Sequence, residues 1–163
     1  MNYHIRVIKP EDEQPFISLY HQYCQEYQSI ERLYPIQYDS SIGLVMWKML
    51  TEEPKRYLAV VAEHEETCVG FCTGEVYHFD EIEKRYYEGT IRGDAWDLYT
   101  AQEWRGKGIG AALLQGLEKE FAAHGCEHMI LNNVDYANTS ARKLYESIGY
   151  APWSVKYYKK ISR

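Results

Sequence analysis

The stretch EWRGKGIGAALL, residues 103–114, is the most informative segment of this chain. It places glycine at positions 106, 108 and 110, with Arg105 and Lys107 alongside, and runs directly into apolar sequence. Apolar residues recurring every three or four positions predict an amphipathic helix from about Gly108 to His124, and Gly125 supplies its stop signal. The residues expected on its buried face are Ile109, Leu113, Leu117 and Phe121.

Glycines at a helix start are typical of an anion-binding turn. The first amides of a helix have no intrahelical acceptor, and the positive end of the helix dipole lies there. Glycine has no Cβ, so an anion can approach those amides closely, and Arg105 and Lys107 add positive charge. The stretch therefore predicts a pyrophosphate site. The alternative is a turn that merely lets a strand enter a helix.

Two common phosphate-binding motifs do not fit this turn. A P-loop needs Ser or Thr after its lysine, but Lys107 is followed by Gly108, which disfavours a nucleotide-phosphate binder. A dinucleotide site needs G-x-G-x-x-G after a first strand, whereas this turn reads G-x-G-x-G and lies late in the chain.

Length and composition predict one globular domain over residues 1–163, since 45% of the residues are hydrophobic and 26% are charged. The net charge is −6 and no basic stripe exists, which argues against a nucleic-acid partner and weakly favours a cationic one. No apolar run approaches the roughly 18 residues of a membrane span. The N-terminus has no apolar signal core, so a cytoplasmic protein without membrane contact is expected.

The four cysteines, at positions 24, 68, 72 and 126, form no CxxC pair and are interpreted as reduced thiols. His124 and His128 flank Cys126, which raises the possibility of a metal site. The cluster lies where a helix ends and a strand begins, and no second ligand cluster exists, so no metal is expected.

Hydrophobic periodicity predicts a mixed α/β chain with the order β-α-α-β-β-β-α-β-α-β. Residues 80–94 lack clear periodicity and are left open between an extended hairpin and a loop. Strands are expected at 3–9, 56–63, 67–79, 95–101, 128–135 and 153–161, and helices at 10–27, 40–54, 108–124 and 139–148.

Two segments resemble signatures of the GNAT N-acetyltransferase superfamily. QEWRGKGIG, residues 102–110, resembles the acetyl-CoA motif Q/R-x-x-G-x-G/A, and NTSARKLYESIGY, residues 138–150, resembles the helix motif N-x-x-A-x-x-L-Y-x-x-x-G-[FY]. The resemblance is specific over residues 96–150. It implies a mostly antiparallel mixed sheet with a splayed parallel strand pair, flanked by about four helices.

The resemblance also implies how acetyl-CoA binds. Amides of the glycine turn would hold the pyrophosphate, and the splayed strand before it would pair with the pantetheine amides, a form of strand addition. The turn residues are Arg105, Gly106, Lys107, Gly108, Ile109, Gly110 and Ala111, and the strand residues are Leu98, Tyr99 and Thr100.

Three candidate catalytic residues and one further contact follow. Tyr145 matches the family's general acid, which protonates the departing thiolate; its alternative is a helix tyrosine packed on the sheet. Asn138 matches a CoA contact and is also expected to cap its helix. Asp97 and Glu75 lie on or beside the central strands and are candidate general bases, although neither matches a fixed motif and each could be a solvated carboxylate.

The expected activity is acetyl transfer from acetyl-CoA to a primary amine by direct attack in a ternary complex. The alternative is a silent CoA-binding sensor or interaction module, which would need the turn but not Tyr145. The acceptor is a small molecule or a peptide, and a homodimer is an open alternative. A cationic acceptor is suggested by the net charge and by the acid-rich positions Asp80, Glu81, Glu83 and Glu88.

Overall fold

A computed structural model describes residues 2–29, 37–132, 134–159 and 161. Within these ranges a single five-stranded sheet has the order β1-β2-β3-β4-β5. Strands β1 to β4 pair antiparallel, and β5 lies parallel to β4. The strands are β1 (His4–Val7), β2 (Tyr57–His64), β3 (Thr67–His78), β4 (Ile91–Thr100) and β5 (Met129–Leu131).

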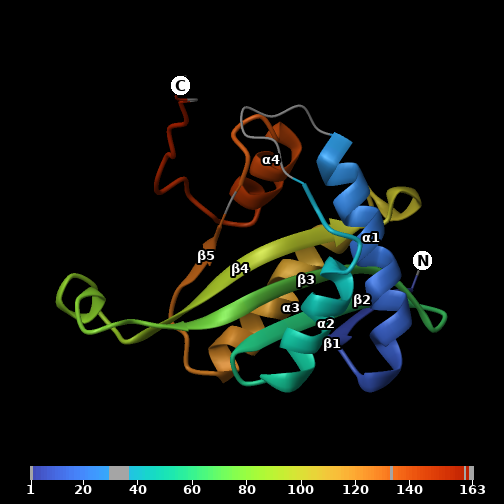
Figure 1. The fold of residues 1–163 in the computed structure, drawn as a ribbon, viewed down its shortest axis with the longest axis horizontal. Helices are drawn as coiled ribbons and strands as arrows, with labels where there is room; N and C mark the ends of the chain where they lie inside the picture. Colours follow the sequence, from blue (N-terminus) through green and yellow to red (C-terminus); the bar gives the residue numbers. More distant parts are fainter. Residues whose placement is uncertain (1, 30–36, 133, 160, 162–163) are drawn as a thin grey trace.

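Helices cover both faces of the sheet (Figure 1). The α-helices of the described residues are α1 (Glu13–Ser29), α2 (Ile42–Glu52), α3 (Ile109–Ala123) and α4 (Thr139–Ser147), and the short 3-10 turns are η1 (Pro10–Asp12), η2 (Glu83–Arg85) and η3 (Gln102–Trp104). This architecture confirms the predicted mixed sheet with its flanking helices. None of the described helices has the length and apolar character needed to cross a bilayer.

Each face of the sheet has its own hydrophobic cluster. On one face α1 and α2 pack Phe16 and Trp47 against Phe71 of β3. On the other face α3 buries Leu117 and Phe121 against the same strands. Glycine makes the second contact possible, because a Cβ on Gly93 would lie only 2.4 Å from the Phe121 ring.

A β-bulge interrupts the pairing of β3 and β4. Cys72 is opposite Leu98 and Gly74 is opposite Ala95, so Trp96 and Asp97 together face Thr73 alone. Both bulge residues consequently turn toward the face covered by α1 and α2. Trp96 packs with the cluster on that face, and Asp97 accepts hydrogen bonds from α1.

Strands β4 and β5 separate after a short parallel ladder. The register runs from Gly93 opposite Met129 to Ala95 opposite Leu131, and the Asn132 N–H then donates to the Ala95 carbonyl. Strand β4 continues to Thr100 without a β5 partner among the described residues. This divergence confirms the splayed parallel pair that the family resemblance implied.

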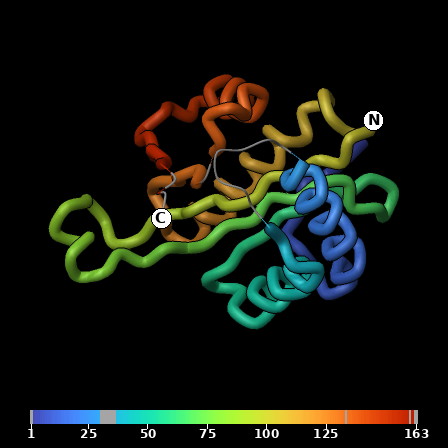
Figure 2. The backbone as a smooth tube through the Cα atoms, turned by 45° about the horizontal axis from the view of Figure 1, so that its top comes forward, coloured from blue at the N-terminus to red at the C-terminus, as the bar shows by residue number. Residues whose placement is uncertain are grey.

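Several predicted boundaries need correction. The open segment 80–94 is a projecting hairpin, in which β4 already begins at Ile91 and η2 lies near the tip (Figure 2). Among the described residues of the strand expected at 128–135, strand structure is confined to Met129–Leu131.

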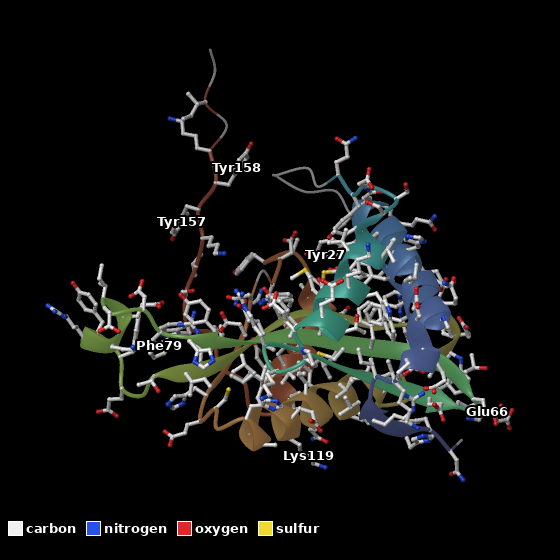
Figure 3. The ribbon with its side chains drawn as sticks, turned by 60° about the horizontal axis from the view of Figure 1, so that its bottom comes forward. Tyr27, Glu66, Phe79, Lys119, Tyr157 and Tyr158 are labelled. Atoms are coloured by element: carbon white, nitrogen blue, oxygen red, sulfur yellow. The ribbon has the colours of Figure 1, made fainter. Side chains whose placement is uncertain are left out.

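The prediction of a strand at 153–161 was wrong. Its described residues have no strand structure, and Tyr157 is 96% exposed on an extension that leads away from the sheet (Figure 3). Alternating apolar residues favour a strand only where a neighbouring strand supplies backbone partners, and none pairs with this described segment.

Candidate functional site

The glycine turn between η3 and α3 presents a row of unpaired amides. Gly106 and Gly108 have φ values of 74° and 81°, a left-handed conformation that other residues adopt only with strain. The N–H groups of residues 106–111 make no hydrogen bond to any described residue. A turn followed by the N-terminus of α3 therefore offers several donors and the positive helix end to an anion.

The two cations of the turn are held by neighbouring groups. Arg105 forms an ion pair with Glu26 of α1, and its Nε donates to the Thr100 carbonyl oxygen at 3.0 Å. Lys107 donates to the Glu103 carbonyl oxygen at 2.6 Å and lies 4.4 Å from the centre of the Trp104 ring. Both positive charges thus stay beside the unpaired amides.

The divergence of β4 and β5 leaves a small cavity. It offers ≈ 20 Å³ to a water-sized molecule, and residues of both strands and of α4 line it. Leu98 lies on this wall, whereas Tyr99 and Thr100 extend the β4 edge toward the turn. The lining residues include Asp97, Leu131, Asn132 and Tyr145.

The candidate acid Tyr145 lies on α4 and lines this cavity. Burial raises the pKa of its phenol to about 12, so the group keeps its proton at neutral pH. The ring contacts Tyr150 edge-on, with 6.3 Å between ring centroids. A protonated phenol at a cavity wall can act as an acid toward a leaving group placed there.

Asn138 caps α4, as its sequence position predicts. Its side-chain oxygen accepts a hydrogen bond of 3.1 Å from the Ala141 N–H. The cap fixes the start of the helix that carries Tyr145. The side of α4 packs closely against α3: a Cβ added to Gly110 of α3 would lie 3.2 Å from Leu144 of α4.

The candidate base Asp97 lies at the β4 bulge and is partly exposed. The Tyr20 hydroxyl donates to one carboxylate oxygen at 2.8 Å, and the Tyr23 hydroxyl donates to the other at 2.7 Å. Burial raises the pKa of Asp97, although these hydrogen bonds oppose the rise. Asp97 is therefore a better proton acceptor than an ordinary surface carboxylate.

The other candidate base, Glu75, lies elsewhere on the same face. Its carboxylate accepts a hydrogen bond of 2.9 Å from Arg56 Nε, and Glu75 does not line the cavity that Asp97 and Tyr145 share. The structure brings Asp97, Leu98 and Tyr145 to one cavity and leaves Glu75 in an ion pair with Arg56.

The acid-rich segment that suggested a cationic acceptor lies on the projecting β3–β4 hairpin (Figure 2). Three of its carboxylates have local partners: Asp80 accepts from the Ile82 and Glu83 N–H groups, Glu83 accepts from Tyr77, and Glu81 forms an ion pair with Lys84. None of the four acidic positions lines the cavity at the β4–β5 divergence.

Sequence reasoning missed the polar role of three residues around this site. Tyr20, Tyr23 and Glu26 lie within the helix predicted at 10–27, but no polar role was predicted for any of them. Their spacing of three residues places all three on one side of α1. Their partners Asp97 and Arg105 are more than 70 positions away, so no local pattern reveals these contacts.

The sequence is similar to parts of two curated acetyltransferases. The chain is 34% identical over 95 residues to a mycothiol acetyltransferase of Thermobispora bispora, which covers 58% of this chain and 30% of that protein. It is 29% identical over 105 residues to a mycothiol acetyltransferase of Kocuria rhizophila, covering 63% of this chain and 32% of that protein. The chain thus spans about a third of the length of these curated relatives.

Solved structures share the fold over nearly the whole chain. The aminoglycoside N-acetyltransferase AAC(6')-Iy, in complex with a CoA bisubstrate analogue, superimposes with a TM-score of 0.76 at 15% identity, covering 99% of this chain and 100% of that one. A ribosomal-protein-alanine N-acetyltransferase of Brucella melitensis biovar Abortus gives a TM-score of 0.71 at 22% identity, with coverage of 99% and 100%.

The profile of the Acetyltransferase (GNAT) family matches residues 16–150, from the first helix to the end of the second signature. With this match over most of its length, the chain belongs to the GNAT acetyltransferase family.

Proposed function

We propose that this protein is an N-acetyltransferase that transfers the acetyl group of acetyl-CoA directly to a primary amine in a ternary complex. The observation that carries the proposal is the divergence of β4 from β5 after Ala95 and Leu131. The unpaired β4 edge and Tyr145 border that divergence, and β4 leads through η3 into the glycine turn at the start of α3.

Acetyl-CoA would lie along the β4 edge, with its pyrophosphate at the turn. The unpaired amides of residues 106–111 would bind the pyrophosphate, helped by the side-chain charges of Arg105 and Lys107. The Arg105 N–H is not among these donors, because it already donates to the Gln102 carbonyl oxygen at 3.3 Å. The backbone of Leu98 to Thr100 would pair with the pantetheine amides. Asn138 would contact the cofactor beside its capping role.

Acetyl transfer then needs one base and one acid. Asp97 would accept a proton from the acceptor ammonium, and the free amine would attack the thioester carbonyl to form the C–N bond. As the C–S bond breaks, Tyr145 would donate its proton to the thiolate. The second amine proton leaves to solvent, and Tyr145 recovers its own from solvent, so the products are an amide and free CoA.

Asp97 is favoured over Glu75 as the base. Asp97 borders the cavity and has a raised pKa, whereas the Glu75 carboxylate is occupied by Arg56. A carboxylate paired with a cation is the weaker proton acceptor. Glu75 stays the second candidate.

The acceptor is proposed at the level of an amine class. The relatives and structural neighbours carry names that refer to mycothiol, to a neamine-type aminoglycoside and to the alanine of a ribosomal protein. We therefore propose a screen of amino sugars, aminoglycosides, polyamines, amino acids and peptides with free N-termini, with acetyl-CoA as donor and release of free thiol as readout.

The screen needs two controls. An amine-free reaction measures hydrolysis of the thioester, and mass spectrometry of the product must show a gain of one acetyl group. Thiol release that depends on an amine supports the proposal. Tight binding of CoA without transfer to any amine would instead support a CoA-binding sensor.

A further inference from the structure

The contacts of Asp97 extend this proposed function. Its two carboxylate oxygens are each hydrogen-bonded by a different tyrosine of α1, at 2.8 Å for Tyr20 and 2.7 Å for Tyr23. Both rings are buried in the cluster beneath α1, with exposures of 3% and 8%. Two fixed donors therefore point at one carboxylate from a single helix.

Packing holds both phenols in place. The Tyr20 ring stacks on Phe71 of β3 with 5.4 Å between centroids, and the Tyr23 ring meets Phe71 edge-on at 5.9 Å. The two tyrosine rings also contact each other at 5.5 Å. Because the surrounding rings already restrict both side chains, the two hydroxyls stay aimed at Asp97.

A third hydroxyl lies opposite the bulge. Thr73 of β3 is fully buried, and among the described residues its Oγ1 is the buried side-chain polar atom without a hydrogen-bond partner. The Thr73 hydroxyl still lies close enough to Asp97 to lower the pKa of that carboxyl. A buried hydroxyl without a partner can rotate toward a neighbouring carboxylate when charge on it needs support.

Among the residues that the structure describes, no compensating cation accompanies Asp97. No described Lys, Arg or His forms an ion pair with it. The titratable groups that face it are neutral phenols and thiols: Tyr20, Tyr23 and Cys24 of α1, Tyr38, and Cys72 of β3, with Tyr145 of α4 on the same cavity. Within the described residues, the negative charge of Asp97 is thus stabilised by hydrogen bonds from neutral hydroxyls.

We propose that Tyr20 and Tyr23 are positioning residues that keep Asp97 ionised and oriented as the general base, and so set the lower pH limit of acetyl transfer. This inference rests on the proposed function. The two phenols stabilise the charged carboxylate, and losing either raises its pKa further. A base works only above its pKa, so the acid limb of the pH profile moves to higher pH.

The test uses Tyr20→Phe and Tyr23→Phe, which keep each ring and remove one donor. Tyr99→Phe is the matched control, because Tyr99 belongs to the same buried cluster but donates to Glu26. The Asp97 pKa is measured without any acceptor, from the pH dependence of carboxyl ¹³C shifts in protein labelled at aspartate, with Asp97→Asn for assignment.

Each tyrosine variant is expected to raise the Asp97 pKa by about 1 unit, from the strength of a hydrogen bond to a charged group. Tyr99→Phe is expected to leave it unchanged. With the acceptor found in the screen, the apparent pKa of the acid limb of the kcat/KM profile should rise by the same amount. The plateau of kcat/KM at higher pH should stay within about twofold of wild type.

Two results would overturn the inference. Unchanged Asp97 titration in both tyrosine variants would show that the phenols do not support the carboxylate. A raised pKa with an unmoved acid limb would show that Asp97 does not titrate in catalysis. Failure of the proposed function is distinguishable, because no amine would then be acetylated by the wild-type protein while the carboxyl titration could still shift.

Thr73→Val provides an independent variant of nearly the same shape in case a tyrosine variant unfolds. It removes the third hydroxyl from the fully buried side of the bulge. This variant is expected to raise the Asp97 pKa by less than the tyrosine variants do. A fall in that pKa would contradict the inference that the surrounding hydroxyls stabilise the Asp97 carboxylate. Near-ultraviolet circular dichroism verifies that each variant keeps its packed aromatic cluster.

Discussion

Arg105 of the glycine turn forms an ion pair with Glu26 at the end of α1. The guanidinium also lies over the Tyr99 ring, 5.6 Å from its centre, and the Tyr99 hydroxyl donates to the same Glu26 carboxylate at 2.6 Å. The helix that bears Tyr20 and Tyr23 is thereby connected to the proposed pyrophosphate site. Glu26 neutralises one of the charges that an anion would meet there.

Glu26→Gln should strengthen CoA binding. The amide can still accept from Tyr99, but it no longer competes with a phosphate for Arg105. Both partners are nearly half exposed, at 48% for Arg105 and 43% for Glu26, so the gain is limited to up to about fivefold in Kd. Calorimetry at low and high salt measures the gain, and Glu52→Gln on α2 is the exposed control. Weaker binding by Glu26→Gln would show that the ion pair positions Arg105 for the cofactor.

Gly108→Asp should abolish or severely weaken CoA binding. It adds a Cβ at a left-handed φ of 81° and a negative charge beside the unpaired amides. Gly89→Asp is the matched control, since Gly89 has a φ of 86° on the projecting hairpin and its Cβ would meet no atom within 4 Å. Calorimetric CoA affinities of the two variants are compared. An equal loss of CoA affinity in both variants would show that the glycine turn is not part of the binding site.

Tyr145→Phe should lower turnover by roughly 10²–10⁴, the usual contribution of a positioned acid. Folding and CoA affinity should change little, because the ring and its packing remain. Tyr150→Phe is the control: its ring neighbours Tyr145, and its hydroxyl donates to Glu118 at 2.6 Å. Rates are measured where chemistry limits turnover. Similar rates in both variants would reduce Tyr145 to a packing residue.

The pH dependence of Tyr145 follows from its environment. Burial raises the pKa of the phenol to about 12, so it remains protonated across the range in which most proteins are stable. No decline of kcat between pH 7 and about 10 is therefore expected from Tyr145.

Asp12→Asn should destabilise the fold at neutral pH. Arg6 donates to both Asp12 oxygens, at 2.6 and 2.8 Å, and also pairs with Glu63 of β2. Burial alone would raise the pKa of Asp12, but Arg6 and the Lys9 N–H outweigh it and hold that pKa below its usual range. Removing one partner of such a buried pair costs roughly 3 kcal/mol in the free energy of unfolding.

The sign of the pH effect follows from the lowered pKa of Asp12. Its contribution to stability is complete above the pKa of the unfolded chain, about 3.9, and is lost as the pH falls through the lower folded value. Urea unfolding at pH 7 and pH 3 should show the difference between variant and wild type shrinking in acid. Glu11→Gln, at an exposed neighbouring position, is the control. A constant difference at both values would exclude the charge pair as its cause.

The local features of this protein could be predicted from its amino-acid sequence. The spacing of Leu113, Leu117 and Phe121 predicted α3, and Asn138 predicted its own capping bond, because helix periodicity and capping depend on residues within a few positions of each other. The two GNAT signatures predicted the family and the splayed parallel strands. The same local reasoning failed for residues 153–161, where alternation indicated a strand although no neighbouring strand pairs with the described part.

The contacts between groups that are distant in the sequence became apparent from the folded chain. The bulge at Trp96 and Asp97 depends on the register between two strands, and a shift of one residue would turn Asp97 to the other face. The contacts of Asp97 with Tyr20 and Tyr23 join positions 77 and 74 residues apart, and the contact of Arg105 with Glu26 spans 79. Local propensity does not encode such pairs, because they arise when two independently folded elements pack face to face.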